Sequence, residues 1–173
     1  MNRRTGEVDD GVVVLRRWSL DDADWYAATA AGDDLIQRYT SESPTLTAEQ
    51  VREAIATLLA ARAGMAGFLI ADGGTGQRLG NIALGYENGV GEVSYWLADH
   101  ARGRGVATRA LRLFSDWAFT VLDLRELRLW THADNAGSRA VAERAGFVRD
   151  PGRDGTRQVK GQVWATVAYR HCR

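Results

Sequence analysis

A short run of glycine and arginine separates two strongly patterned segments of the chain. The run reads Ala101-Arg102-Gly103-Arg104-Gly105-Val106-Ala107-Thr108. Before it, residues 91–98 alternate in the manner of a β-strand, and after it apolar residues recur at helical spacing over residues 107–121. A strand that passes through a glycine loop directly into an amphipathic helix favours an α/β fold, because the helix has to pack its apolar stripe against a sheet.

This loop has the composition of an anion site. The start of a helix presents N–H groups without intrahelical partners and the positive end of the helix dipole, and it therefore binds phosphate. Gly103 and Gly105 allow the backbone to come close to an anion. Four arginines lie in the loop or within about a turn of it: Arg102, Arg104, Arg109 and Arg112. These features fit a pyrophosphate, and a solvated arginine-rich turn is the competing interpretation of the same residues.

Two familiar phosphate loops do not match this segment. A P-loop ends in Gly-Lys-Ser/Thr, which Val106-Ala107 does not supply. A Rossmann fingerprint needs an early strand and a third glycine, whereas this loop comes late in the chain and lacks that glycine.

Composition narrows the class of protein. The length of 173 residues suits one domain over residues 1–173, with residues 1–10 expected to be a flexible N-terminus. The 22 Lys and Arg residues balance the 22 Asp and Glu residues, so we expect neither a nucleic acid nor a membrane as a partner. No apolar run approaches ~20 residues, the single cysteine is Cys172, and no residues have metal-ligand spacing. We therefore expect a cytoplasmic protein without a metal.

The rest of the chain alternates between strand and helix patterns. Strands are expected at residues 12–18, 68–71, 79–86, 91–98, 126–132 and 163–169. Ser19 is expected to begin a helix that ends at Gly32, and Thr47 with Gln50 forms the capping box of a second one. A third helix follows the glycine loop, and a fourth spans residues 135–145 and is closed by Gly146. This order predicts a mostly antiparallel front and one strand–helix–strand unit.

The chain resembles the GNAT N-acetyltransferases. Their pyrophosphate loop has the form Arg/Gln-x-x-Gly-x-Gly/Ala, which Arg102-Gly103-Arg104-Gly105-Val106-Ala107 satisfies. The strand Val93-Ser94-Tyr95-Trp96-Leu97 precedes the loop, and a helix pattern follows from Asp134-Asn135 to Ala145-Gly146-Phe147. The resemblance is strongest over residues 80–148. It is closest to the branch that acetylates the N-termini of ribosomal proteins, which has a similar Tyr-Trp-Leu strand and Asn-x-x-Ser helix start. It implies a single α/β (α+β) domain, with a mixed, mostly antiparallel sheet of six or seven strands and about four helices.

The same resemblance implies acetyl-CoA as the cofactor. Its pyrophosphate would lie on the loop formed by Arg102, Gly103, Arg104, Gly105, Val106, Ala107 and Thr108. In this family the strand that contains Tyr95, Trp96 and Leu97 splays from its neighbour near a bulge, and its free backbone groups bind the pantetheine arm. An N–H near Leu97 would polarise the thioester carbonyl, as a preorganised donor does. Asn135 matches an asparagine that contacts the CoA arm.

Candidate catalytic residues lie within this strand, in the turn before it and farther along the chain. Many GNAT enzymes have a tyrosine seven residues after that asparagine to protonate the leaving thiolate, but this chain has Ala142 there. Ser138 matches the ribosomal-type branch, in which a serine takes that role, although such a serine is otherwise a cap or a solvated hydroxyl. The amine also needs a base. Glu92 is the first candidate, Glu87 the second and His132 a third, against the commoner role of each as a surface or structural residue.

The expected function is transfer of an acetyl group from acetyl-CoA to a primary amine, with Trp96 beside the acceptor. A protein N-terminus is the first acceptor to consider, and a small amine (an antibiotic, polyamine or amino acid) is the second. A non-catalytic GNAT-like module that binds CoA is a different class of function. An RNA-binding module fits less well with zero net charge. A homodimer is compatible with this branch.

Overall fold

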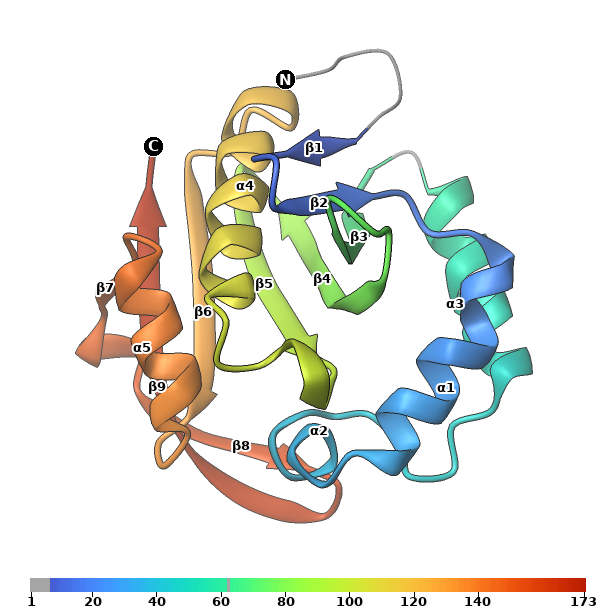
Figure 1. Cartoon of the computed structure of the whole chain (residues 1–173). Coiled ribbons are helices and arrows are strands. Elements are labelled where there is room, and N and C mark those ends of the chain that lie inside the picture. The colour runs from blue at the N-terminus through green and yellow to red at the C-terminus, as the bar shows by residue number, and fades with distance from the viewer. Residues whose placement is uncertain (1–6, 62) are drawn as a thin grey trace.

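The computed structural model describes residues 7–61 and 63–173 and builds them around one twisted sheet (Figure 1). Its nine strands in this part of the chain are β1 (Val8–Asp9), β2 (Val13–Arg16), β3 (Met65–Asp72), β4 (Arg78–Glu87), β5 (Val90–Leu97), β6 (Glu126–His132), β7 (Val148–Arg149), β8 (Gly155–Val159) and β9 (Gln162–Cys172). The spatial order is β1-β2-β3-β4-β5-β6-β9-β7, with β8 paired to β9. Among these pairs only β5 and β6 are parallel. The mostly antiparallel sheet with one strand–helix–strand unit is thus confirmed.

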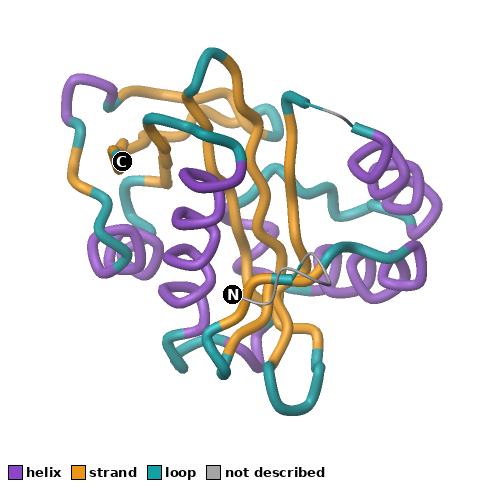
Figure 2. Tube along the Cα trace, turned by 90° about the horizontal axis from the view of Figure 1, so that it is seen from above, coloured by secondary structure: helices purple, strands orange, loops and turns teal. Residues whose placement is uncertain are grey.

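Helices cover both sides of this sheet, as the view from above shows (Figure 2). The five α-helices of the described residues are α1 (Ala23–Gly32), α2 (Asp34–Tyr39), α3 (Ala48–Ala60), α4 (Val106–Val121) and α5 (Ala136–Arg144). Strand β3 explains why two layers are needed, because both of its faces are apolar. Phe68 and Ile70 pack in the core that contains α4, whereas Leu69 and Ala71 pack against α1 and α3.

Side-chain caps mark the start of three helical segments, and two of these caps are predicted by the sequence. Ser19 forms a capping box with Asp22 and begins a 3₁₀ turn, Leu20–Asp22, that runs into α1. Thr47 forms the same motif with Gln50 at the start of α3. The Asn135 side chain accepts a hydrogen bond from the backbone N–H of Ser138 at the start of α5. These caps satisfy N–H groups that would otherwise lack partners.

The described residues contain more elements than the six or seven strands and four helices that the sequence predicts, and the additional elements are short. β1 and β7 have two residues each, most of β8 is exposed, and α2 has six residues, so none carries a strong periodic pattern. Their pairing partners hold the three strands in place: β2 for β1, and β9 for β7 and β8. The short strands therefore form through tertiary contacts with their partners, and local sequence periodicity does not predict them.

The segment expected to be flexible, residues 1–10, includes a short strand. Residues 1–6 lie outside the described residues, but Val8–Asp9 form β1. Gly11, with a φ of 83°, makes the turn into β2, and the Asp10 carboxylate accepts the backbone N–H of Val12 and of Val13. A left-handed glycine and an aspartate that caps its own turn are the usual ingredients of such a hairpin.

The central feature of the sheet is a fork between β5 and β6. These strands pair only from Val90–Glu92 to Glu126–Arg128 and then separate. On its other side, β5 stays paired with β4 as far as Leu97, where a Cβ on Gly80 would lie 2.2 Å from the carbonyl oxygen of Trp96. The predicted splay is therefore present, but the bulge is not beside it, because the register shift lies between β3 and β4 at Ile70/Ala71.

Candidate functional site

A cleft of about 760 Å³ occupies the fork and extends to both faces of the sheet. On the side of α4 and α5 it is lined by the loop before α4 and by the first turns of both helices. On the opposite side it is lined by α2 and the segment after it. β5 serves both sides because its side chains alternate: Tyr95 reaches Ser138 of α5, whereas Trp96 packs against Trp25 and Tyr26 of α1. The volume is typical of a site for a small molecule.

The start of α4 has the properties of an anion site. Gly103 and Gly105 have φ angles of 71° and 75°, a backbone conformation that residues other than glycine rarely adopt. Gly105 is the N-cap, and no side chain of the described residues caps the helix. The first N–H groups of α4, from Val106 to Thr108, therefore lack a side-chain acceptor at the wall of the cleft.

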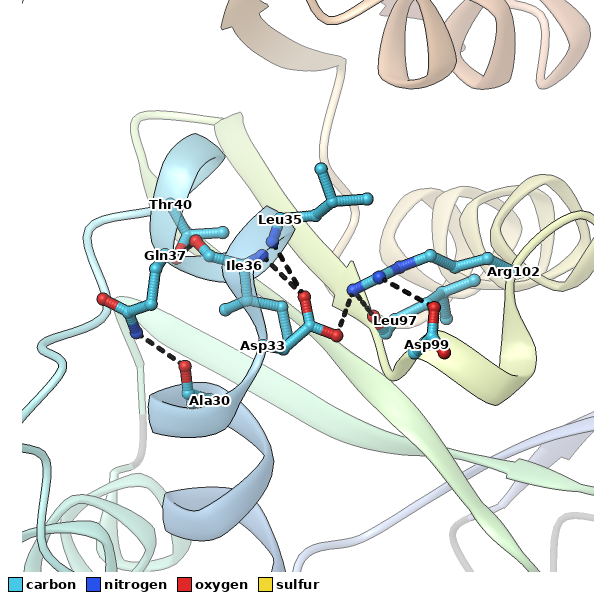
Figure 3. Close-up of polar contacts among 9 residues, drawn as sticks. All are labelled: Ala30, Asp33, Leu35, Ile36, Gln37, Thr40, Leu97, Asp99 and Arg102. Atoms are coloured by element: carbon cyan, nitrogen blue, oxygen red, sulfur yellow. Dashed lines mark hydrogen bonds and ion pairs between the residues drawn. The ribbon is translucent and has the colours of Figure 1, made fainter.

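Arg102 lies at the cleft, but its guanidinium is directed at protein groups (Figure 3). Its Nη2 atom donates to the carboxylate of Asp33 at 2.7 Å and to the Leu97 carbonyl oxygen at 2.8 Å. Asp33 is the N-cap of α2 and also accepts the backbone N–H of Leu35 and of Ile36. Burial opposes the charged form, yet the contacts with Arg102 and these N–H groups hold the pKa of Asp33 below its usual value. Arg102 thus joins the loop before α4 to α2.

The other three arginines of the predicted anion site do not line the cleft. Arg109 pairs with Asp10 at 2.7 Å, and Arg112 donates to the carbonyl oxygen of Arg144. Arg104 is exposed and does not line the cleft. Arg144, in the last turn of α5, does line it, and sequence reasoning missed this residue because its helical neighbours gave no signal of a site.

Ser138 lies at the cleft and contacts Tyr95. The two hydroxyl oxygens are 3.0 Å apart and share a hydrogen bond. Burial raises the pKa of Tyr95 to about 12, while the hydrogen bond from Ser138 acts in the opposite direction. Asn135 also lines the cleft, and Ala142 is fully buried in the core. Because Ala142 stands where many GNAT enzymes have a tyrosine, no hydroxyl is available at that position. The hydroxyl groups of Ser138 and Tyr95 lie beside the start of α5.

We refer to the side of the cleft that faces α1 and α2 as the acceptor side. A cluster of aromatic and acidic side chains lies there. Trp96 is 6% exposed and packs with its ring centroid 4.9 Å from that of Tyr26. Tyr26 donates to Glu42 at 2.5 Å, and burial, with the nearby Glu42 charge, raises the pKa of this tyrosine. Glu42 lines the cleft, although it belongs to no motif or periodic pattern in the sequence. The sequence shows it only as an acidic residue in the polar segment between two helices.

The three predicted bases are separated by the fold. Glu92 lines the cleft; its carboxylate accepts the indole N–H of Trp130 at 2.9 Å and pairs with Arg157 at 3.4 Å. Glu87 lies exposed at the distant turn between β4 and β5 and does not line the cleft. His132 packs between the rings of Tyr39 and Trp164 and contacts Asp134 at 2.6 Å, also outside the cleft lining. Glu92 is the only one of the three at the cleft.

Two kinds of feature are absent from the described residues, 7–61 and 63–173. Within them, no helix combines the length and apolar character that a membrane span requires. No group of three or more His, Cys, Asp or Glu side chains in the same residues is arranged to hold a metal ion.

Comparison with known families gives a match over most of the chain. Residues 13–148 match the model of the acetyltransferase (GNAT) domain. YdaF of Bacillus subtilis (strain 168), a candidate ribosomal N-acetyltransferase, is 38% identical over 65 residues, which is 37% of this chain and 36% of YdaF. The match therefore spans about a third of the length of that curated relative.

Solved structures share the whole architecture. RimJ of Mycobacterium smegmatis, in complex with CoA-disulfide, superposes with a TM-score of 0.80 at 22% identity over 94% of this chain and 82% of that one. Spermidine N-acetyltransferase of Vibrio cholerae, in complex with CoA and spermine, gives 0.81 at 18% identity over 94% and 96%. At these identities the likeness concerns the fold, which enzymes with different acceptors share.

Proposed function

Because the chain belongs to the GNAT acetyltransferase family, we propose that it transfers the acetyl group of acetyl-CoA to a primary amine entering from the acceptor side. The observation that carries this proposal is the single cleft through the β5–β6 fork. At one side of the cleft an uncapped helix start suits a pyrophosphate. At the other side, the carboxylates of Glu42 and Glu92 suit an ammonium group that has to lose a proton.

The residues on the α4 side fit acetyl-CoA. Open space surrounds the Cα atoms of Gly103 and Gly105, where a Cβ would meet nothing within 4 Å, so an anion has room to approach. The N–H groups of Val106, Ala107 and Thr108 would hold its pyrophosphate, and the edge of β5 from Tyr95 to Leu97 would hold the pantetheine arm. When bound, acetyl-CoA supplies the acetyl group as an activated thioester.

Ser138 is the proposed proton donor to the leaving group. Its hydroxyl lies at the cleft, and its hydrogen bond to Tyr95 fixes the position of the oxygen. Tyr95 keeps its own proton near neutral pH because burial raises its pKa to about 12. Tyr95 is therefore a positioning residue: it keeps its own proton and holds the Ser138 hydroxyl at the cleft through the shared hydrogen bond.

Glu92 is the proposed base, and Glu42 is the competing carboxylate. The indole of Trp130 and the guanidinium of Arg157 orient Glu92, and the Tyr26 hydroxyl orients Glu42. Both side chains face the acceptor side of the cleft, which is where the amine has to be deprotonated before it attacks.

A protein N-terminus is the acceptor we propose, because the Asn-x-x-Ser start of α5 and the partial match to YdaF both indicate the ribosomal-type branch. A small cationic amine is the second candidate. The observation that favours it is the acidic lining of the acceptor side by Glu42 and Glu92, together with the shared fold of a spermidine N-acetyltransferase.

Thiol release from acetyl-CoA, measured with a panel of peptides and polyamines, tests this function. Glu92→Gln and Ser138→Ala should each lower kcat by about 100-fold or more, since general acid–base groups contribute ~10²–10⁴. Glu42→Gln distinguishes the two carboxylates: the true base is the one whose loss removes the acidic limb of the pH–rate profile. Glu87→Gln is the matched control and should retain full activity. Tight CoA binding without turnover of any amine would contradict the proposal and indicate a CoA-binding module.

A further inference from the structure

A second hollow lies beside the cleft on the acceptor side. Its volume is about 370 Å³, and its charged lining consists of Glu92 and three arginines: Arg128, Arg153 and Arg157. We refer to it as the arginine hollow. Arg128 belongs to β6, whereas Arg153 and Arg157 come later in the chain, from the 3₁₀ turn Pro151–Arg153 and from β8. The fold of the C-terminal strands therefore brings them together.

The arginine hollow has the geometry to hold carboxylates. Arg128 pairs with Glu126 through Nε at 2.6 Å, and Arg153 pairs with Asp150 through Nε at 3.2 Å. Arg157 lies 4.3 Å over the Trp130 ring and touches Glu92 at 3.4 Å. Each guanidinium carries five N–H donors in a planar fork, so one ion pair leaves donors for an additional carboxylate. The indole restricts the motion of Arg157 and so prepares it for binding.

The arginine hollow is continuous with the cleft. Glu92, Leu129 and Trp130 line both of them. An extended peptide advances ~3.3 Å per residue, so a chain whose first amine lies at Glu92 reaches the arginines with its next few residues. A polyamine that extended from Glu92 into the arginine hollow would be repelled by the positive charges of the arginines.

We propose that the arginine hollow binds acidic side chains that follow the acceptor amine, so that the protein selects N-terminal segments with Asp or Glu among their first residues. This inference rests on the proposed acetyl transfer to a protein N-terminus. Each arginine is accompanied by a carboxylate, and the chain as a whole has no net charge. This arrangement favours a few discrete acidic side chains over the continuous phosphates of a nucleic acid, which require an excess of positive charge.

Acetylation of three synthetic peptides tests the proposal. They have the sequences Ser-Asp-Glu-Asp-Ala-Ala, Ser-Asn-Gln-Asn-Ala-Ala and Ser-Lys-Lys-Lys-Ala-Ala, with amidated C-termini and saturating acetyl-CoA. We expect kcat/KM for the acidic peptide to exceed that of its amide isostere by about tenfold at low salt, and the ratio to shrink as salt screens the contact. Arg153→Glu should abolish this preference and raise kcat/KM for the lysine peptide several-fold. Arg128→Gln should reduce the preference in part.

The controls separate this inference from the proposed function. Arg157 is left unchanged because it touches Glu92. Arg52→Glu makes the same charge change as Arg153→Glu, but on α3, outside both hollows, and should preserve the selectivity. Equal rates for all three peptides would overturn the arginine hollow as a specificity site while leaving acetyl transfer intact. No acetylation of any peptide would overturn the proposed function as well. Unchanged selectivity in Arg153→Glu, together with loss of binding to a fluorescent RNA oligonucleotide, would assign the arginines to a nucleic acid.

Discussion

At the scale of single residues, Asp22 joins three parts of the fold. Its side chain is 1% exposed, and it accepts hydrogen bonds from Arg16 of β2, Arg78 of β4 and the backbone N–H of Ser19. Burial alone would raise its pKa, but these three donors lower it to about 2 from an ordinary 3.8. A depressed pKa contributes stability that is complete above pH 4 and is lost as the pH falls toward 2, by about 2 kcal/mol.

Replacement of this carboxylate should therefore lower stability and remove part of its acid dependence. We expect Asp22→Asn to reduce the free energy of unfolding by about 2–4 kcal/mol at pH 7, because two arginines lose a buried partner. Between pH 4 and pH 2 the variant should lose less stability than the parent protein. Urea unfolding at several pH values measures both effects. Asp21→Asn, at the exposed neighbouring position, should change little, and a similar loss in both variants would contradict this role of Asp22.

Some residues of the site could be predicted from the sequence and others could not. Ser138 follows from its position in the Asn-x-x-Ser motif and Glu92 from its place in the strand before the glycine loop, and both line the cleft. Arg102 also lines the cleft, but its ion pair with Asp33, 69 positions away, could not be predicted, because no local pattern indicates such a pair. Glu42 was missed for the same reason: it reaches the cleft through the path of a loop, and loops carry no periodicity.

At the scale of elements, Asp33 connects α2 to the loop before α4. One carboxylate oxygen caps α2, and the other accepts from Arg102. Asn retains the capping oxygen but loses the charge, whereas Ala loses both. We expect Asp33→Asn to cost about 1 kcal/mol of stability and Asp33→Ala about 1 kcal/mol more, as measured by urea unfolding.

The same pair of variants should affect cofactor binding. Without Asp33, Arg102 loses one of the contacts that hold it beside the Leu97 carbonyl, so the loop that starts α4 becomes less ordered. We expect CoA affinity, measured by calorimetry, to fall about threefold to tenfold in both variants. Affinity that is lost only in Asp33→Ala would show that the helix cap, and not the ion pair, is responsible.

Elements with strong local signals were predictable, and elements that depend on distant contacts were not. The amphipathic α4, the capping boxes and the long strands β4, β5 and β6 follow directly from residue spacing. α2 has only six residues and is too short to be stable by propensity alone; its cap and the ion pair to Arg102 support it from outside. The β8 strand likewise depends on β9, with most of its side chains in solvent.

At the scale of the whole molecule, the fork divides the sheet into two parts. β1 to β5 form one part and β6 to β9 the other, and only three residue pairs join them directly. α4 packs in a core that contains residues of both parts, α5 lies over the second part, and Tyr95 contacts Ser138 across the cleft. A ligand in the cleft touches both parts, so its binding should stabilise their relative position.

CoA binding should therefore stabilise the protein and protect both sides of the fork. At a CoA concentration about 100 times the Kd, linkage predicts about 2.7 kcal/mol, which raises the melting temperature by roughly 5–10 °C for a chain of this size. Amide hydrogen exchange should slow in the outer half of β5, in the unpaired half of β6 and at the starts of α4 and α5. Protection confined to α4 would mean that the ligand does not bridge the fork, and the cleft would then be two separate sites. Protection on both sides, with unchanged exchange in α3, would show that the cofactor contacts both parts of the sheet at the fork.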